Sequence, residues 1–354
     1  MVATASTPHA QPSPGPGVGT RRPSGSGGDP GVLTGDDIDF LLRHAILAPS
    51  SHNTQPWIFE VHDARIDVHA DLTRWLEVAD ADRRELHVSL GCAIENLVLA
   101  GEYLGLAPTV LLFPDAARPD HVATLRFPGR ASEDRPSRPV ELLEVVAARH
   151  TERRAFDSRP IPERVRSELG ALAVESGVRI QFIDLPSLRQ NIEDLTVRAD
   201  QIQYDDRSWR RELAHWIGEG VFGTGWLMSR IGRFAVRHFD LGRSVSETDR
   251  ERLASAPLLG IVTTASSSPA DRVRAGQVFQ RLFLAATRAG LGLHPMNQVL
   301  QVPRVRDELV ALLPGEWGTP QMVFRLGYAE VDRSRRPSPR RPLAEVVRRR
   351  GEGM

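Results

Sequence analysis

The alternation of apolar and polar positions predicts short helices and strands from residue 34 onward. Thr34 and Asp37 form a T-x-x-D capping pattern, and apolar residues follow at helical spacing until Pro49 ends the helix. Trp57–His62 and Arg65–Ala70 alternate with a period of two, so they predict a hairpin. The chain therefore begins its ordered part with a helix followed by paired strands.

A charged, Pro-containing segment at 129–139 has few apolar groups and is typical of a linker between two series of elements. The other predicted elements are a helix over 86–104 ended by Gly105, strands over 109–113 and 121–127, helices over 139–149 and 162–176 (the second ended by Gly177), a strand over 178–184, mostly helix over 186–218, a strand over 258–264, a helix over 272–289 ended by Gly290, and a strand over 321–328.

The two series resemble each other. NLVLAGEYLGL at 96–106 and RLFLAATRAGL at 281–291 share Leu, Leu, Ala, Gly and Leu in register, and each ends a long predicted helix. We interpret this as an internal duplication. The expected fold is α+β, with one half at 34–138 and a second at 139–354 that carries an insertion near 186–255. Residues 1–33, rich in Pro, Gly and Ser, are expected to be disordered.

The amino-acid composition excludes several kinds of catalytic and binding site. The 45 basic residues among 354 are all arginine. Without lysine, no Schiff base and no Walker A phosphate loop can form. Any fixed positive charge that binds an anion must be an arginine.

Charge and cysteine content narrow the partners. The formal net charge of zero argues against a broad basic nucleic-acid surface, and the single Cys92 excludes an internal disulfide. No apolar run reaches the length of a membrane span, and the first residues lack a signal-peptide core. We expect a cytoplasmic protein without nucleic-acid or membrane partners.

Three features favour ordinary structural roles. Gly218, Gly220 and Gly223 fit G-x-G-x-x-G, but a predicted helix precedes them, so a helix end is favoured over a dinucleotide site. The histidines form no ligand pattern that would indicate a metal. Cys92 lies in an apolar helix and is expected to pack rather than react.

The string APSSHNTQPWIF at 48–59 is rich in polar side chains. It could be a well-formed turn, because Asn and Ser bond nearby backbone and Pro56 fixes the exit into a strand. Ser50, Ser51, Asn53 and Gln55 together also offer the donors and acceptors that the polar edge of a flat heterocycle requires.

The string RHTERRAF at 149–156 joins two predicted helices. If it is extended, Arg149, Thr151 and Arg153 point the same way, and two guanidinium groups with one hydroxyl would suit a phosphate. A solvated, charged turn is the alternative.

Together these strings resemble the nitroreductase superfamily of FMN proteins, in which two subunits build each flavin site. Ser50, Ser51, Asn53, Gln55, Pro56 and Trp57 resemble the S-S-x-N-x-Q-P-W segment of one subunit. Arg149, Thr151 and Arg153 resemble the R-x-S-x-R segment of the other, with Thr in place of Ser.

Later segments follow the same family order. GLGLHP, ending at Pro295, resembles the turn over the flavin. The resemblance implies that His294 and Met296 contact the flavin there. VFRLGYA at 323–329 resembles a late strand. SPRRPLAEVV at 338–347 resembles the closing segment whose basic residues, here Arg340 and Arg341, reach the phosphate.

Having both strings in one chain resembles the Acg-type subfamily, in which the nitroreductase unit is duplicated. One site would then form between the halves. The mirror site would be lost, because the first half lacks R-x-S-x-R and the second lacks N-x-Q-P-W. The chain would be a monomeric pseudo-dimer or would pair again as a homodimer.

The resemblance implies an FMN-dependent NAD(P)H oxidoreductase. Hydride would pass by a ping-pong route through flavin N5 to a nitroaromatic, quinone or similar acceptor, with no catalytic side chain required. The aromatic residues of the insertion could pack a core, or they could form a lid over the flavin. A closed lid would exclude substrate, so the alternative is an FMN-binding protein with little turnover. These aromatic residues are Trp209, Trp216, Phe222, Trp226 and Phe234. A scaffold that has lost flavin is the third possibility.

Overall fold

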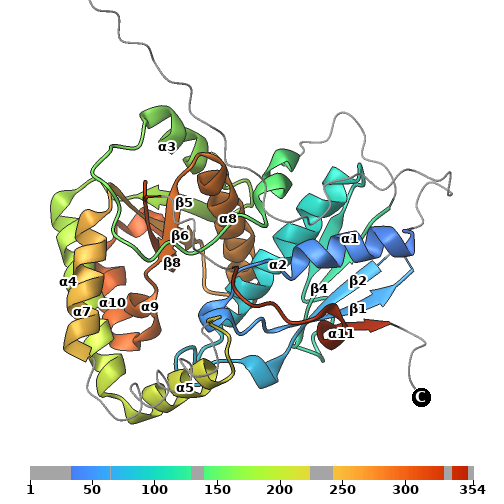
Figure 1. Ribbon diagram of the computed structural model, residues 1–354, viewed down its shortest axis with the longest axis horizontal. Coiled ribbons are helices and arrows are strands. Elements are labelled where there is room, and N and C mark those ends of the chain that lie inside the picture. Colours follow the sequence, from blue (N-terminus) through green and yellow to red (C-terminus); the bar gives the residue numbers. More distant parts are fainter. Residues whose placement is uncertain (1–32, 64, 129–138, 224–241, 331–336, 350–354) are drawn as a thin grey trace, which may run out of the picture.

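The computed structural model describes residues 33–63, 65–128, 139–223, 242–330 and 337–349 (Figure 1). Residues 1–32, most of the predicted linker, and Trp226 and Phe234 of the insertion lie outside this part. Within it, no helix is both long enough and apolar enough to cross a membrane. Leu33, which the sequence placed in the disordered tail, is buried, so packing begins one residue earlier than expected.

The first half contains the predicted helix, hairpin and long helix. Thr34 and Asp37 cap the first helix reciprocally, which confirms the capping pattern, and the hairpin strands have the predicted bounds. Its elements are α1 (Gly35–Ala45), η1 (Ser51–Asn53), β1 (Trp57–His62), β2 (Arg65–Ala70), η2 (Leu72–Arg74), α2 (Arg84–Tyr103), β3 (Thr109–Leu112) and β4 (His121–Arg126).

The second half contains the predicted strands and long helix, together with short elements that the pattern did not show. Its elements are η3 (Val140–Val145), α3 (Glu163–Gly170), β5 (Val178–Phe182), α4 (Pro186–Asp205), α5 (Arg207–Gly218), α7 (Gly242–Ser255), β6 (Leu258–Thr264), α8 (Pro269–Arg288), β7 (Gly292–Pro295), α9 (Gln298–Gln301), α10 (Pro303–Leu312), η4 (Gly315–Trp317), β8 (Thr319–Gly327), α11 (Leu343–Val346) and β9 (Val347–Arg349).

The two sheets repeat one topology. In the first, the order is β3-β4-β2-β1, and in the second it is β7-β8-β6-β5, with every one of these neighbours antiparallel. A long helix follows the second strand of each half, α2 after β2 and α8 after β6. The chain is thus an α+β protein of two related halves, as the sequence predicted.

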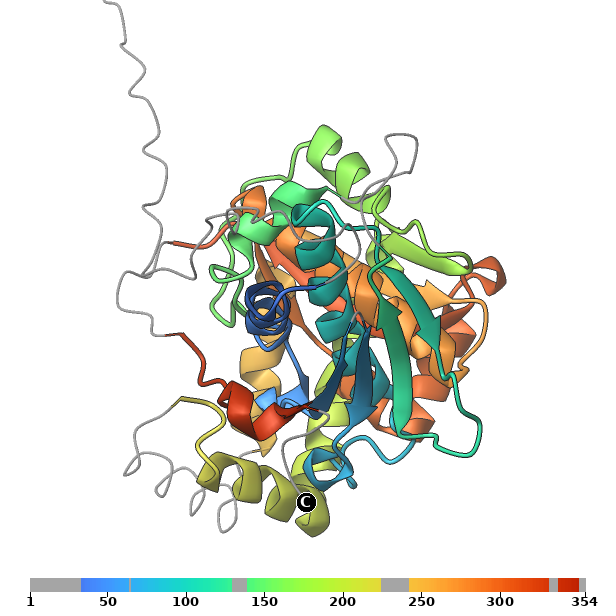
Figure 2. The same cartoon turned by 90° about the vertical axis from the view of Figure 1, so that its right-hand side faces the viewer.

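The long helices α2 and α8 pack against each other at the centre, with one sheet on either side (Figures 1 and 2). A Cβ atom on Gly91 would lie 2.1 Å from the Val273 carbonyl oxygen, and one on Gly276 would lie 2.1 Å from that of Val88. The two contacts are reciprocal, and they have the same offset of 185 positions that relates 96–106 to 281–291. Such reciprocity is typical of a two-fold interface, here within one chain.

Buried polar pairs obey the same symmetry. Arg281 Nε donates to Glu95 Oε1 at 2.7 Å, and Gln280 Nε2 donates to Asn96 Oδ1 at 2.7 Å. Cys92 is buried in α2, where its thiol donates to the Gly276 carbonyl at 3.3 Å, which confirms a packing role.

The C-terminal strand β9 crosses back to the first half and pairs in parallel with β1 at the edge of that sheet. The segment before it, 337–342, therefore runs along the first half although it belongs to the end of the chain (Figure 2). This return brings Arg340 and Arg341 beside the loop at 48–57.

Two predicted helices are wrong in length or type. The helix expected over 162–176 ends at Gly170, because the Leu172 carbonyl accepts from Arg281 Nη1 at 2.8 Å and Glu175 also bonds that guanidinium. The segment 139–149 forms only the short 3-10 helix η3. The G-x-G-x-x-G string begins at the last residue of α5, as expected for a helix end.

Candidate functional site

A cavity of about 340 Å³ lies between the two halves. The first half contributes the loop after α1 and the start of α2; the second contributes 151–153, β7, α9 and the inserted helices. Its lining includes Pro49, Ser50, Ser51, His52, Glu85, Ser89, Cys92, Thr151, Arg153, Asp200, Gln203, Tyr204, Trp209, Leu213, Phe222, Asp249, Arg252, Phe279, His294, Pro295, Asn297, Gln298, Gln301 and Met322. Of the eleven residues that the sequence singled out, five belong to this wall: Ser50, Ser51, Thr151, Arg153 and His294.

The loop after α1 has an unusual backbone. His52, Asn53 and Gln55 have φ values of 47°, 55° and 53°, a left-handed region that is uncommon for residues other than glycine. The Gln55 N–H donates to Ser50 Oγ at 2.9 Å, which closes the turn. Ser50 and Ser51 thereby face the cavity, and strain of this kind often accompanies a functional loop.

Asn53 and Gln55 bind the returning C-terminal segment instead of lining the cavity. Asn53 Nδ2 donates to the Pro339 carbonyl at 3.0 Å, and Arg340 Nη1 donates to Asn53 Oδ1 at 2.8 Å. The Arg341 N–H donates to Gln55 Oε1 at 2.8 Å, and its guanidinium pairs with Asp71 at 3.0 Å. The amides of this loop therefore fix where the end of the chain lies.

Arg149 and Arg340 meet outside the cavity lining, near one end of it. Each donates from Nη2 to the Leu47 carbonyl at 3.3 Å, two residues before Pro49 of the wall. The Arg149 guanidinium also lies 4.8 Å from the centre of the Phe283 ring. Burial lowers the pKa of Arg340 to about 10, which leaves it charged at neutral pH. Two cations from distant parts of the sequence thus converge on one carbonyl.

The segment at 151–153 pairs with β7, which meets the condition under which Thr151 and Arg153 would point the same way. Thr151 forms a parallel bridge with Leu293 of β7, and the Glu152 N–H donates to the Leu293 carbonyl at 3.0 Å. Thr151 and Arg153 face the cavity, and Arg153 has no ion pair within the described ranges. Glu152 points the other way; burial alone would raise its pKa, but hydrogen bonds from Arg154 outweigh this and lower it to about 2.

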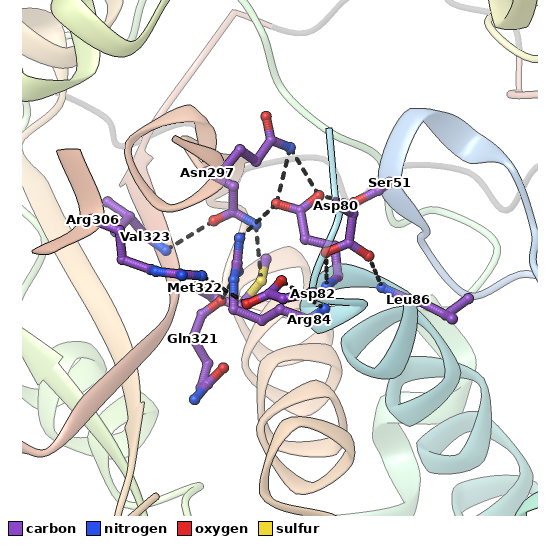
Figure 3. Close-up of polar contacts among 12 residues, drawn as sticks. Ser51, Asp80, Asp82, Arg84, Leu86, Asn297, Arg306, Gln321, Met322 and Val323 are labelled. Atoms are coloured by element: carbon purple, nitrogen blue, oxygen red, sulfur yellow. Dashed lines mark hydrogen bonds and ion pairs between the residues drawn. The ribbon is translucent and has the colours of Figure 1, made fainter. Parts of the chain in front are cut away.

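A polar network that the sequence did not reveal lies under the cavity at the start of α2 (Figure 3). Asp80 accepts from the N–H groups of Glu85 and Leu86, both at 2.8 Å, and so caps the helix. Glu85 is buried and accepts from Arg84 at 3.1 Å, from Gln301 at 3.0 Å and from the Ser51 hydroxyl. Ser51 is therefore held by a carboxylate from its own half and, through it, by α9 of the other.

His294 and Met296 differ in position. His294 lines the cavity, and burial followed by the charge of Arg325 lowers its pKa well below the usual value, so the ring is neutral. Met296 is fully buried in the core of the second half. Asn297, not singled out from the sequence, faces the cavity instead, and its Oδ1 accepts from the Val323 N–H at 3.0 Å.

The insertion between β5 and β6 forms a further wall. Trp209 and Trp216 are buried, and they cluster with Leu76 and Ala79 of the first half, so α5 lies against both halves. Asp200, Tyr204 and Asp249 from α4 and α7 complete this side of the cavity. Nothing in the sequence distinguished Asp200, Tyr204 and Asp249 from ordinary helix positions, whereas Trp209 and Trp216 stood out as aromatic residues of the insertion.

No family model matches the chain. It is 29% identical over 320 residues, 88% of this chain and 91% of the relative, to the protein named "Putative NAD(P)H nitroreductase Rv3131" of Mycobacterium tuberculosis. It is 28% identical to "Putative NAD(P)H nitroreductase acg" of the same organism, over 89% of this chain and 96% of the relative. The crystal structure of the FMN-dependent nitroreductase NfnB from Mycobacterium smegmatis in complex with NADPH covers 59% of this chain and 96% of its own, with 21% identity and a TM-score of 0.38.

Proposed function

We propose that the chain is a nitroreductase-type oxidoreductase, like the relatives it resembles, that it binds FMN, and that it uses NADH or NADPH to reduce a nitroaromatic, quinone or similar acceptor. The observation that carries this is the cavity between the halves, to which Ser50 and Ser51 come from one half and Thr151 and Arg153 from the other. Bound there, FMN would supply hydride transfer through its N5 atom.

The residues present suit such a cofactor. The volume lies within the range of about 300–1,000 Å³ that is typical of small-molecule sites. The hydroxyls of Ser50, Ser51 and Thr151 offer donors and acceptors to a polar ring edge, and Phe279 supplies aromatic surface to one face of the ring.

We assign the cations to two places. Arg149 and Arg340, which share the Leu47 carbonyl, would neutralise the phosphate, because guanidinium pairs suit that geometry. Arg153, inside the cavity, would lie against the flavin and favour negative charge on the ring. Asn53, Gln55 and Arg341 would act indirectly, by holding the closing segment in place.

The repeated topology supports the inference that residues 34–138 and 139–354 arose by duplication, with the insertion near 186–255 added to the second half. The arginine string is present only in the second half and the amide-rich string only in the first. One FMN per chain is therefore expected, whether the chain is a monomer or pairs again. Two FMN per chain would contradict this assignment.

The test begins with the purified protein. It should show a flavin absorbance spectrum or acquire one with added FMN, and anaerobic NADH or NADPH should bleach it. A colourless protein that does not take up FMN would remove the proposal altogether.

A second candidate rests on the position of the insertion. Because α5 packs against both halves beside the cavity, a bound flavin could be enclosed and exchange no hydride with NAD(P)H. The chain would then be an FMN-binding protein with little turnover. A yellow protein that neither NADH nor NADPH bleaches would favour this candidate.

A further inference from the structure

One carboxyl group in the cavity wall has no role in the site described so far. Asp200 of α4 is 4% exposed and lines the cavity. Its Oδ2 has no hydrogen-bond partner among the residues whose positions are described. A buried carboxylate oxygen without a hydrogen-bond partner is costly, so such an atom either binds a ligand or holds a proton.

The surroundings of Asp200 favour the proton. Burial, and then the charge of Asp249 on α7, raise the pKa of Asp200 to about 8. Asp249 accepts from Arg252 Nη1 at 2.6 Å and from Gln298 Nε2 at 2.9 Å. Gln298 and the charge of Arg252 also lower the pKa of Asp200, but burial and Asp249 outweigh them. A neighbouring negative charge and loss of hydration both disfavour the ionised form of a carboxyl group, so Asp200 favours its protonated form.

The other groups around α4 do not change this assignment. Tyr204, one turn later, has its pKa raised to about 12 by burial and by Asp200, so it stays neutral. Gln298 on α9 and Trp209 on α5 are uncharged, and Glu308 of α10 is paired with Arg198 at the surface. Asp249 and Arg252 are thus the charged groups that face Asp200.

The neighbourhood also indicates what Asp200 would contact. Tyr204, Trp209 and Phe222 give this side of the cavity aromatic walls, which suit a flat ring. A carboxylic acid donates one O–H hydrogen bond, which a ring carbonyl oxygen accepts. A quinone has both a flat ring, which the aromatic walls can hold, and a carbonyl oxygen, which can accept the hydrogen bond.

We propose that Asp200 determines acceptor specificity: as a neutral carboxylic acid, it donates a hydrogen bond to a carbonyl oxygen of a quinone held between the aromatic walls. This rests on the proposed function, since it names the acceptor class for that site. Asp249 is a positioning residue, because its proximity disfavours ionisation of Asp200.

The test measures binding without turnover. The oxidised holoprotein, with no NAD(P)H present, is titrated calorimetrically with 2,3-dimethyl-1,4-naphthoquinone, whose blocked ring carbons do not alkylate Cys92. The matched ligand is 2,3-dimethylnaphthalene, which has the same ring and no carbonyl. Between about pH 6 and about pH 10 the quinone should lose about three- to tenfold in affinity as Asp200 ionises, the effect of one hydrogen bond. The hydrocarbon should bind with constant affinity.

Asp200→Asn keeps a donor that does not ionise, so its quinone affinity should stay constant over the same pH range. Asp200→Ala should bind the quinone about three- to tenfold more weakly at low pH. Asp205→Asn, exposed at the end of the same helix, should behave as the wild type. Equal pH dependence for both ligands, or for wild type and Asp200→Asn, would overturn the proposal.

The wild-type titrations keep the test decisive even if a variant does not fold. They also separate the two proposals. If NAD(P)H bleaches the flavin but the quinone affinity depends on neither pH nor Asp200, the proposed function is supported and the role of Asp200 is contradicted. If NAD(P)H does not bleach the flavin but quinone binding depends on Asp200, the enzyme function is contradicted and the role of Asp200 as a hydrogen-bond donor is supported.

Discussion

The centre of the molecule is symmetric, and its candidate site is not. Around α2 and α8, Gly91 and Gly276 make reciprocal contacts, and Glu95 pairs with Arg281 as Asn96 pairs with Gln280. The connections between the matching strands differ completely. Only residues 63 and 64 separate β1 from β2 in the sequence, whereas the chain between β5 and β6 includes α4, α5 and α7.

This difference indicates that one set of residues stabilises the fold and another set determines the chemistry of the cavity. The symmetric contacts are buried and hold the two sheets together, so they define the space between the halves. The residues that would give this space its selectivity, such as Asp200, Tyr204 and Trp209, come from the unmatched insertion. A frame with repeated topology can therefore hold a site whose selectivity comes from a segment present in one half only.

The largest expected effect comes from the buried ion pair at the symmetric centre. Arg281 is 1% exposed and Glu95 is fully buried. Arg281→Met leaves that carboxylate without its guanidinium, and the free energy of unfolding should fall by about 4 kcal/mol. Urea unfolding measures this. Arg288→Met, which removes the surface pair with Glu141, should cost less than about 1 kcal/mol. Similar losses for both would mean that the centre contributes no more than the surface.

The next effect tests the symmetry itself. Gly91→Ala and Gly276→Ala each place a methyl group against a backbone carbonyl that cannot move away without separating the helices. Each should cost about 2–3 kcal/mol, and the two losses should be similar because the contacts are reciprocal. Gly35→Ala, where the added atom meets nothing within 4 Å, is the control in the same assay. A loss at only one of the central glycines would contradict the two-fold packing.

A smaller effect belongs to the asymmetric side. Arg153→Ala removes the cation inside the cavity and should weaken FMN binding about tenfold or more, the usual contribution of a charged hydrogen bond. Fluorescence titration of the apoprotein with FMN measures the affinity. Arg164→Ala, exposed on α3, is the matched control. Unchanged FMN affinity in Arg153→Ala would refute the assignment of Arg153 to the flavin.

Much of the frame followed from local sequence signals. The cap of Thr34 and Asp37 and the alternation in β1 and β2 are encoded by neighbouring residues, so they could be predicted. The end of α3 could not, because Arg281 takes the Leu172 carbonyl from more than a hundred residues away.

The residues of the candidate site also fall into those that the sequence could predict and those that it could not. Ser50, Ser51, Thr151 and Arg153 stood out because polar groups were dense in short strings. Glu85 and Asp200 occupy ordinary helix positions, and only the packing of α2 and α4 turns them toward the cavity. Met296 was expected at the flavin, yet the turn after β7 directs it into the core and presents Asn297 instead.

The smallest effect compares the outer faces of the two sheets. His62, His69 and His121 gather around Asp67 on the first sheet, whereas β5, β6 and β8 carry no histidine. Burial, followed by the charge of His121, lowers the pKa of His69, although Glu60 and Asp120 oppose this. The unfolded chain therefore takes up a proton at higher pH than the folded one, so stability falls as pH drops below about 6.5.

Replacing His69 by Gln removes that contribution. Between about pH 7.5 and about pH 5.5, the wild type should lose up to about 1 kcal/mol more unfolding free energy than His69→Gln, as measured by urea unfolding at each pH. His215→Gln, exposed on α5, should keep the wild-type pH dependence. If His69→Gln instead follows the wild type throughout, His69 does not contribute to the pH dependence of stability, and the histidine cluster of the first sheet has no effect that β5, β6 and β8 lack.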